Sequence, residues 1–384
     1  MKILLRLYGL GWGYPEQRRR IELVTAGRFQ VERADVESGL EGEAFLWPTC
    51  RMVGSAKMRV IDPGLMDDWL TERESAGFRS HLSASQTALT LAALLNLADF
   101  VHDLRDRALR LCDRLLRQLA EHTCEGVVSG PQAVADRYIL YPHSAWTQGL
   151  LSFAAGSNVV ESFSPWAVFL ASSAYRSPSD LNALIQRATS RTYHEAGWPL
   201  SPHKTDYGML SSVAIDITRS VDAKSRHLWH ATLGRGCHVF VNHPSSPSDD
   251  SEPFWHGNGV TPRIAQEGNT LFTTYDIPEN HPIGFTHAHW PIDAFEGTLN
   301  RDGWHIGRSH KGAAIGLWWN LPTQLTSDVL QGRELRAWGQ RAAWICVCGA
   351  PDNGSIEIFL ESCLSSRPEL RESGQLVWEG QIVL

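Results

Sequence analysis

The spacing of hydrophobic positions changes once along the chain, near residue 200. From about residue 64 to 190, apolar residues recur every three or four positions, and between 104 and 119 leucines alternate with Arg and Asp at that spacing. Such a pattern is typical of amphipathic helices. After about residue 200 the period falls to two, and Gly, Asn-Gly, Asp-Gly and Pro separate short apolar runs, as in antiparallel strands. The pattern predicts helices first and strands second.

The predicted elements give an α+β fold class in which helices and strands are segregated. The predicted helices are about 83–97, 104–119, 131–138, 145–155, 165–174 and 178–190. The predicted strands are about 209–217, 227–233, 238–242, 270–277, 283–289, 313–319, 341–348, 355–361 and 376–383. Strands in such number and at such spacing are typical of an antiparallel β-sandwich.

The same pattern divides the chain into three segments. Residues 1–62 form an extended, strand-like lead-in, residues 63–198 a helical domain, and residues 199–384 a β-sandwich domain. Because ligands often bind where domains meet, we expect the functional site between the two halves.

Composition and charge exclude several classes of protein. The net charge of −7 argues against a nucleic-acid partner, and no apolar run approaches the roughly 18–20 residues that span a bilayer, so no membrane partner is expected. Arg6 interrupts the apolar N-terminal run, which therefore does not form a secretory signal. The default expectation is a cytoplasmic protein, unless the N-terminus is truncated. The seven cysteines include no C-x-x-C pair and are expected to be reduced thiols without a zinc role.

Histidine is the residue type whose distribution points to chemistry. Eleven of the sixteen histidines fall between residues 203 and 310, where an even spread would place four or five. Imidazole transfers protons near neutral pH and binds metal ions, so this region is the candidate site. The alternative is that a strand-rich domain carries His at turns and edges. The chain also contains fifteen Trp, which suit flat, ring-shaped ligands or a core.

One cluster combines a possible base with groups that bind a carboxylate. Within residues 254–266, Trp255 and His256 precede Asn258, Arg263 and Gln266. A guanidinium offers a planar pair of donors to a carboxylate, and the two amides donate neutral hydrogen bonds.

A second cluster, His287 and His289, has the spacing of two metal ligands on one strand. Residues two apart in a strand point to the same face, about 7 Å apart at roughly 3.3 Å per residue. Neutral imidazoles bind Zn, Mn or Fe, with Asp293 or His256 as a possible third ligand. The alternative is two polar residues on a hydrated face.

In the helical half, Arg137, Tyr138, Tyr141 and His143 form an unusually polar and aromatic connection. The alternative interpretation is that both tyrosines pack in the core with satisfied hydroxyls. The chain contains no G-x-S-x-G, P-loop, Rossmann glycine or H-E-x-x-H motif, which removes the commonest hydrolase, nucleotide-binding and zincin hypotheses.

Several local runs carry a family resemblance. They are Tyr207–Ser212, Leu228–Leu233, Asn242–Pro244, Phe254–Gly259, Pro262–Arg263 and Phe285–Ala288. With the helix-then-strand layout, the chain resembles polysaccharide lyases of the heparinase II/III and hyaluronate-lyase type, and a group of uncharacterised microbial proteins with that layout. The resemblance covers about residues 125–361. It implies a partial α/α toroid-like helical domain before the sandwich.

The resemblance also implies a function, namely β-elimination on a uronate-containing glycan, with an acidic polysaccharide or oligosaccharide as the partner. Asn258, Arg263 and Gln266 would neutralise the uronate carboxylate. His256 with Tyr207 or Tyr138 would be the acid–base pair. The implied substrate-binding residues are Trp255, Trp290, Arg137 and His143, of which the two tryptophans would stack on sugar rings.

No cofactor is required for this chemistry, although His287 and His289 could hold a structural divalent metal, Zn or Ca. Two alternatives remain. The chain could be a non-catalytic carbohydrate-binding protein of the same fold, or a metal-dependent glycan hydrolase that uses the His287/His289 pair.

Overall fold

The computed structural model describes residues 63–156, 164–215, 225–234, 236–248, 252–326, 330, 332–350 and 355–384. The predicted lead-in, 1–62, therefore lies outside the described residues. The chain forms two compact units. Of the described residues, a helical unit holds those up to Ala120 together with Ser144–Leu184 and His194–Gly197, and a strand-rich unit holds those of Glu121–His143, Ile185–Tyr193 and Trp198–Leu384.

Helices come first and antiparallel sheets second, as the change of period predicts, so the α+β class holds. The units do not, however, divide the chain at one point. The predicted helical domain, 63–198, includes residues 121–143 and 185–193, which group with the strands. In the strand-rich unit, for example, the backbone at Gln132 pairs with His227. The predicted helix at 131–138 is thus an isolated bridge to the segment before β7, followed by a 3-10 turn, η2 (Arg137–Ile139).

The helical unit is built around one apolar helix. Helix α5 (Ala84–Phe100) is apolar on nearly every side and contributes a continuous run of buried residues from Leu91 to Ala98. Helices α7 (Trp146–Ala155) and α8 (Ala167–Ala171) contact it. Helix α6 (Arg105–Glu121) is amphipathic, with Leu111, Leu115 and Leu119 on its buried side. The remaining helices are α4 (Pro63–Ala76) and α9 (Leu181–Gln186), with a 3-10 turn, η1 (His102–Leu104).

No single helix of the described ranges is long and apolar enough to cross a membrane. One bent pair, Ala84–Phe100 with His102–Glu121, passes that test jointly, across a bend of 120°.

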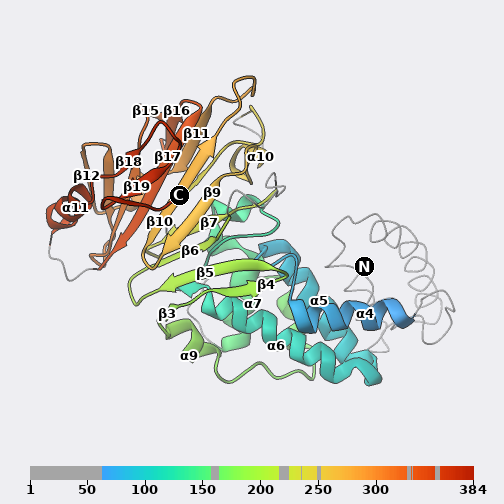
Figure 1. The fold of residues 1–384 in the computed structure, drawn as a ribbon. Coiled ribbons are helices and arrows are strands. Elements are labelled where there is room, and N and C mark those ends of the chain that lie inside the picture. The colour runs from blue at the N-terminus through green and yellow to red at the C-terminus, as the bar shows by residue number, and fades with distance from the viewer. Residues whose placement is uncertain are drawn as a thin grey trace. The chain divides into compact units, whose positions relative to one another are not determined.

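The strand-rich unit contains two large antiparallel sheets (Figure 1). In the described residues, the larger sheet has the order β15-β16-β11-β8-β7-β6-β5-β3, with β4 paired to β5. Its strands are β3 (Thr189–Ser190), β4 (Tyr193–Glu195), β5 (Trp198–Lys204), β6 (Met209–Val213), β7 (Trp229–Thr232), β8 (His238–Asn242), β11 (Phe285–His289), β15 (Thr323–Thr326) and β16 (Glu334–Trp338).

The second sheet has the order β12-β13-β14-β17-β10-β9. Its strands are β9 (Arg263–Glu267), β10 (Thr270–Asp276), β12 (Gly297–Arg301), β13 (Trp304–Arg308), β14 (Ala314–Trp319) and β17 (Arg341–Gly349). The smaller elements of this unit are β1 (Thr123–Cys124), β2 (Val127–Val128), η3 (Pro142–Ser144), α10 (Glu252–Trp255), η4 (Ile292–Ala294), α11 (Ile356–Ser365), β18 (Glu369–Leu370), β19 (Leu376–Trp378) and β20 (Gln381–Ile382).

Hydrogen bonds join the two large sheets face to face. The indole Nε1 of Trp344 on β17 donates to Thr286 Oγ1 on β11 at 2.8 Å. The hydroxyl of Ser212 on β6 donates to the Gln266 side chain on β9 at 2.6 Å. The facing sides are therefore in contact, as in a β-sandwich.

The other face of the second sheet is covered by α11 (Figure 1). The prediction of a strand at 355–361 is wrong, because this segment forms that helix. Ser355 caps it by accepting a hydrogen bond from the Ile358 amide, and Phe359, Leu360 and Cys363 recur at helical spacing on its buried side. The alternation of Ile356, Ile358 and Leu360 imitates a strand over those five residues only.

The described cysteines agree with the prediction of reduced thiols. They are all buried and free, namely Cys112, Cys124, Cys237, Cys346, Cys348 and Cys363. Burial raises the pKa of Cys112, Cys346 and Cys363, and it raises the pKa of Cys124 to about 12 and that of Cys237 to about 11. They are therefore unreactive small core residues.

Candidate functional site

One face of the larger sheet carries a concentration of histidines, and the strand pleat explains it. Along β8, His238, Phe240 and Asn242 share a face, while Val239 and Val241 point to the other side, toward the second sheet. The register pairs His287 with Asn242 and His289 with Phe240, so the two β11 histidines lie on the same face as the β8 residues. The prediction that His287 and His289 share a face is confirmed.

Neighbouring strands extend this polar face. On β7, His230 lies opposite Ser211 of β6. On β16, Arg336 lies opposite His287, and Glu334 lies opposite His289. We call this surface the histidine face, defined by Ser211, His230, His238, Asn242, His287, His289, Glu334 and Arg336.

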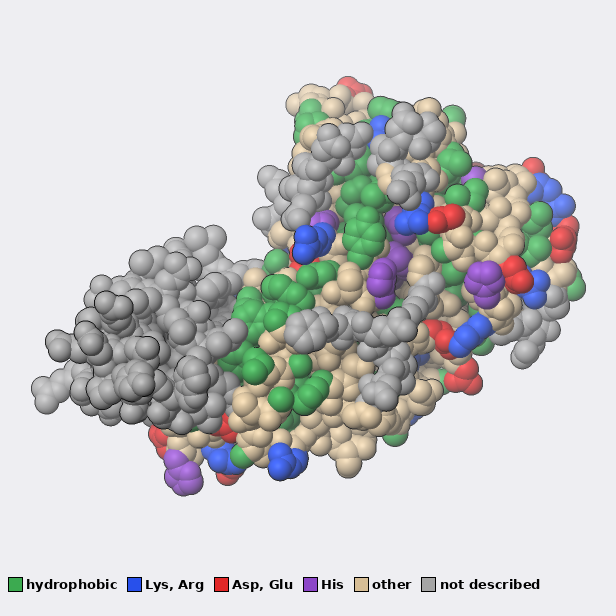
Figure 2. Space-filling view, turned by 180° about the vertical axis from the view of Figure 1, so that it is seen from behind, with side chains coloured by type: hydrophobic (Ala, Val, Ile, Leu, Met, Phe, Trp, Pro, Cys, Tyr) green, Lys and Arg blue, Asp and Glu red, His purple; other side chains and the backbone are tan. Residues whose placement is uncertain are grey.

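Four histidines form a continuous row along the sheet. His227 and His230 share a hydrogen bond of 3.0 Å between Nε2 and Nδ1. The rings of His230 and His238 stack with centroids 5.5 Å apart, and those of His238 and His289 with centroids 4.7 Å apart and planes within 13°. All four are buried, and on the side drawn in Figure 2 histidine side chains reach the surface only as separate patches. We call these residues the histidine row.

Burial keeps the histidine row neutral. Removal from water lowers the pKa of His227 to about 3 and that of His289 to about 4, and it lowers the pKa of His230 and His238 well below the ordinary value. Hydrogen bonds to backbone carbonyls then define which ring nitrogen carries the proton in two of the four residues. His238 donates from Nε2 to the Leu140 carbonyl at 3.0 Å, and His289 donates from Nδ1 to the His238 carbonyl at 2.8 Å. Each ring is left with one nitrogen that can accept a proton.

His287 belongs to a separate buried ion cluster. It donates from Nδ1 to Glu334 at 2.7 Å, and Glu334 also accepts hydrogen bonds of 2.8 Å from Arg336 and from Thr326. Burial raises the pKa of Glu334, but these hydrogen bonds outweigh it and hold the pKa below its ordinary value. Burial also holds the pKa of His287 low. The cluster is therefore an ionised carboxylate that orients a neutral imidazole.

The β11 end of the histidine row is next to partly exposed charges. Arg333 and Asp293 form a two-pronged ion pair, with Nε to Oδ1 at 2.7 Å. Burial is the main cause of the low pKa of His289, and the positive charge of Arg333 lowers it further. Tyr141, which is exposed, directly follows Leu140, whose carbonyl accepts from His238, the ring that stacks on His289. A proton acceptor, a guanidinium and a phenol are thus grouped at this edge.

All the predicted site residues belong to the strand-rich unit, but the structure does not bring the predicted carboxylate-binding group together. Asn258 is buried, and its side-chain oxygen accepts from the Tyr275 hydroxyl at 2.9 Å and from the His243 amide at 3.2 Å. Its amide nitrogen donates to the Arg226 carbonyl. Asn258 therefore holds its own loop in place.

Arg263 and Gln266 point to opposite faces of β9, because they are three residues apart in a strand. Arg263 donates to Thr274 at 3.1 Å and to the Gly374 carbonyl at 2.7 Å. Gln266 bridges to β6, where it donates to the Leu210 carbonyl and accepts from Ser212. Neither side chain can join Asn258 around one carboxylate.

The predicted acid–base pair of His256 and Tyr207 is also separated. Tyr207 lies in the turn before Met209, at the end of the sheet where Thr232 pairs with His238. His256 follows α10, and its carbonyl accepts from Ser245, beyond the far end of β8. Tyr207 and His256 are therefore separated by at least the length of β8, which is about 13 Å at roughly 3.3 Å per residue.

Tyr138 is placed nearer to the histidine row. It is buried on η2, where the Arg137 guanidinium lies over its ring at 5.5 Å, and Leu140, two residues later, accepts the hydrogen bond from His238. Arg137 and His143 are exposed, as substrate-binding residues would be. Their predicted role stays a prediction.

The two predicted sugar-stacking tryptophans are core residues. Trp255 stacks on His287 with centroids 4.2 Å apart, and Trp290 packs on Phe295 at 4.9 Å. Both rings are buried, so neither has a face for a sugar.

A metal at His287 and His289 has no third ligand in the described part of the chain, where no group of three His, Cys, Asp or Glu side chains is arranged to hold an ion. Asp293 is paired with Arg333, and the Nδ1 atoms of both histidines are already hydrogen-bonded. The metal remains a hypothesis.

The residues that sequence reasoning missed are Arg333, Glu334 and Arg336. His230 and His238 lie in the histidine-rich region that the sequence points to, but no role was predicted for them. The one local signal for His238 is the alternation His238-Phe240-Asn242. Glu334 and Arg336 reach the histidine face only because β16 pairs with β11, and this pairing joins positions about fifty residues apart in the sequence.

No protein-family model matches the chain, and no curated protein matches it. Among solved structures, the crystal structure of heparinase III is similar, with a TM-score of 0.37 and 10% sequence identity. The similarity covers 82% of this chain and 62% of that chain, so this chain spans less than two thirds of heparinase III. The similarity is distant and assigns no role to any residue.

Proposed function

We propose that the chain is a polysaccharide lyase that cleaves a uronate-containing glycan by β-elimination at the β11 end of the histidine row. The observation that supports this is the grouping of neutral His289 with Arg333, whose carbonyl accepts from the adjacent Trp290 amide, and with Tyr141, which follows the Leu140 carbonyl that accepts from His238. Elimination beside a carboxylate needs these three functions, namely a proton acceptor, a cation for the carboxylate and a proton donor.

The roles follow from the chemistry of each group. Arg333, held by Asp293, pairs with the uronate carboxylate and stabilises the negative charge that develops when the neighbouring C–H bond breaks. His289 accepts that proton on Nε2, because its Nδ1 proton is hydrogen-bonded to the His238 carbonyl. The electron pair of the C–H bond forms the new C=C bond as the C–O bond to the leaving sugar breaks. Tyr141 gives its phenolic proton to the leaving oxygen.

The approach of the substrate carboxylate would itself help the base. A negative charge near an imidazole raises its pKa, so the pKa of His289 would rise from about 4 toward neutrality when the uronate binds. Proton transfer is most efficient when the pKa of the base lies near the working pH.

The test is to incubate the protein with a panel of uronate polymers and to record near-ultraviolet absorbance, since each elimination leaves an unsaturated uronate. We expect a signal with at least one polymer, and a loss of about 10²-fold or more in rate for His289→Ala and for Tyr141→Phe. His310→Ala, at an exposed histidine of the same unit, is the control and should keep full activity. The absence of unsaturated product from every polymer would reject the proposal.

A non-catalytic carbohydrate-binding protein is the second candidate. The pKa of about 4 for His289 favours it, because so weak a base accepts protons poorly at neutral pH. Such a protein would bind the same polymers without forming unsaturated product, and His289→Ala would weaken binding only slightly.

A further inference from the structure

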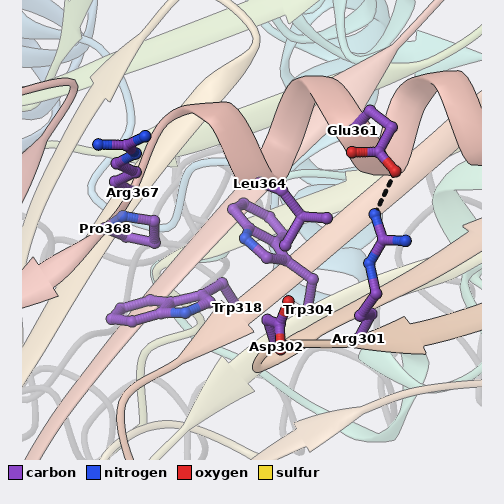
Figure 3. A pocket seen from close by; sticks show the side chains of 8 residues that line it. All are labelled: Arg301, Asp302, Trp304, Trp318, Glu361, Leu364, Arg367 and Pro368. Atoms are coloured by element: carbon purple, nitrogen blue, oxygen red, sulfur yellow. Dashed lines mark hydrogen bonds and ion pairs between the residues drawn. The ribbon is translucent and has the colours of Figure 1, made fainter.

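A cavity of about 540 Å³ lies on the outer side of the second sheet, away from the histidine face, which belongs to the other sheet. It is open to solvent and is bordered by α11, the β12–β13 turn, β14 and the segment before β18 (Figure 3). Its lining residues are Arg301, Asp302, Trp304, Trp318, Glu361, Leu364, Arg367 and Pro368. A volume of roughly 300–1,000 Å³ is usual for sites that bind small molecules.

The two ends of the cavity offer different chemistry. Figure 3 shows Trp318, Pro368 and Arg367 together at one end, and the Arg301–Glu361 ion pair at the other. Trp318 keeps 8% of its surface exposed, whereas Trp304, its cross-strand partner on β13, is 1% exposed and packs on Trp378. The apolar contact surface of the cavity is therefore made mainly by Pro368 and Leu364, which are partly exposed, with the exposed edge of Trp318.

Two charged groups remain available at the mouth. Within the described residues, the side chains of Asp302 and Arg367 form no hydrogen bond or ion pair with the protein, and both are exposed. Their backbones are fixed in the left-handed region, with φ of 50° at Asp302 and 47° at Arg367. Non-glycine residues adopt this region rarely, so the fold holds both side chains at defined points of the rim.

The turn beneath Asp302 is also constrained. Gly303 has φ of 81°, and a Cβ at this position would lie 3.1 Å from the Trp318 indole nitrogen. Asp302 and Gly303 thus form a two-residue hairpin turn in which both φ angles are positive. The close approach of the turn to Trp318 sets the distance between the carboxylate and the indole.

We propose that this cavity binds a neutral sugar unit of a glycan, separately from the histidine face and whether or not the chain is a lyase. Sugar hydroxyls both donate and accept hydrogen bonds, and the cavity presents carboxylates that accept them and guanidiniums that donate them. Two Arg, one Asp and one Glu line it, so their formal charges cancel and an anionic sugar gains no advantage. The apolar face of the sugar ring contacts Pro368 and Leu364, which are partly exposed, and the exposed edge of Trp318.

The experiment measures binding to the full chain by saturation-transfer NMR and calorimetry. The probes are neutral trisaccharides of glucose, galactose, mannose and N-acetylglucosamine, with a uronate trisaccharide as the charged comparison. We expect at least one neutral probe to bind, with its ring protons in contact with the protein. Asp302→Asn and Arg367→Ala should each weaken that binding about tenfold, since each removes a hydrogen bond to a charged group.

The controls separate this site from the proposed lyase site. Arg371→Ala, at an exposed arginine outside the cavity, should change the affinity by less than about twofold, the usual effect of a distant rim charge on a neutral ligand. His289→Ala should leave neutral-sugar binding intact even if it abolishes activity. Asn accepts positive φ well, so Asp302→Asn keeps the turn, and thermal melting verifies folding. Failure of all neutral probes to bind, or binding unaffected by both cavity variants, would overturn the proposal.

Discussion

Replacement of Glu334 by Gln tests whether the buried ion cluster holds the histidine face together. Glu334 and His287 are fully buried, and Arg336 is 18% exposed. Gln keeps the shape of the side chain but removes the charge that three donors share, and it presents an amide N–H group to donors. Removal of one partner from a buried pair usually costs about 3–5 kcal/mol. Because water can reach part of Arg336, we expect the lower end, about 3 kcal/mol.

The assay is thermal and urea unfolding, followed by tryptophan fluorescence. For a folding unit of about 150–250 residues, 1 kcal/mol shifts the midpoint by roughly 2–4 °C, so the expected drop is about 6–12 °C. The matched control is Glu361→Gln, in an ion pair with Arg301 whose side chains are 66% and 47% exposed. Pairs of that kind contribute roughly 0–1 kcal/mol.

The comparison of the two variants shows whether the Glu334 cluster stabilises the folded protein. If Glu334→Gln loses no more stability than Glu361→Gln, the cluster does not stabilise the sheet and the reasoning is refuted. A double variant that also carries Arg336→Gln gives a second check. Its loss should be smaller than the sum of the two single losses, because the two residues compensate each other's charge.

Three further predictions concern pH and packing. The folded-state pKa of His289, about 4, lies below its ordinary value of 6.5, so the unfolded chain binds more protons between these values. Stability should therefore fall as pH drops from about 6.5 to 4, by up to about 1.4 kcal/mol per pH unit for each such histidine, and a melting temperature that stays constant over this range would contradict it. Gly349→Ala places a Cβ in steric overlap with the Phe359 ring, and we expect a loss of about 1–3 kcal/mol in urea unfolding, whereas a neutral result would mean that α11 shifts freely. Ser355→Ala removes the cap of α11 and should cost about 1 kcal/mol, with Ser355→Thr as the conservative control that retains most of the stability.

The sequence predicts those parts of the fold that depend on local periodicity. The change of period near residue 200 gives the order of helices and sheets, and the two-residue spacing of His287 and His289 gives their common face. Both follow from the pleat of a strand and the pitch of a helix. Where a short run satisfies both periods, as in 355–361, the pattern alone does not decide between helix and strand.

The candidate site was harder to predict, because it depends on which strands become neighbours. Proximity along the chain suggested that Asn258, Arg263 and Gln266 act together. Arg263 and Gln266, however, are three positions apart in strand β9 and therefore point to opposite faces of the sheet. Conversely, Glu334 meets His287 only through the pairing of β16 with β11. The prediction that Trp255 and Trp290 stack on sugars failed for another reason, because composition does not show whether an indole faces a ligand or the core.

The division of the chain between the two units has a consequence for its synthesis and engineering. The chain enters the strand-rich unit at Glu121, leaves it at Ser144, and returns twice more, at Ile185 and at Trp198. A fragment that begins at residue 199 would lack the backbone partner of His227, the carbonyl that accepts from His238, and strand β3. During translation, segments of the strand-rich unit emerge before the last segment of the helical unit has been made. Neither unit can therefore be produced by a single cut in the gene, and a β-sandwich expressed alone would need residues 121–143 supplied in addition.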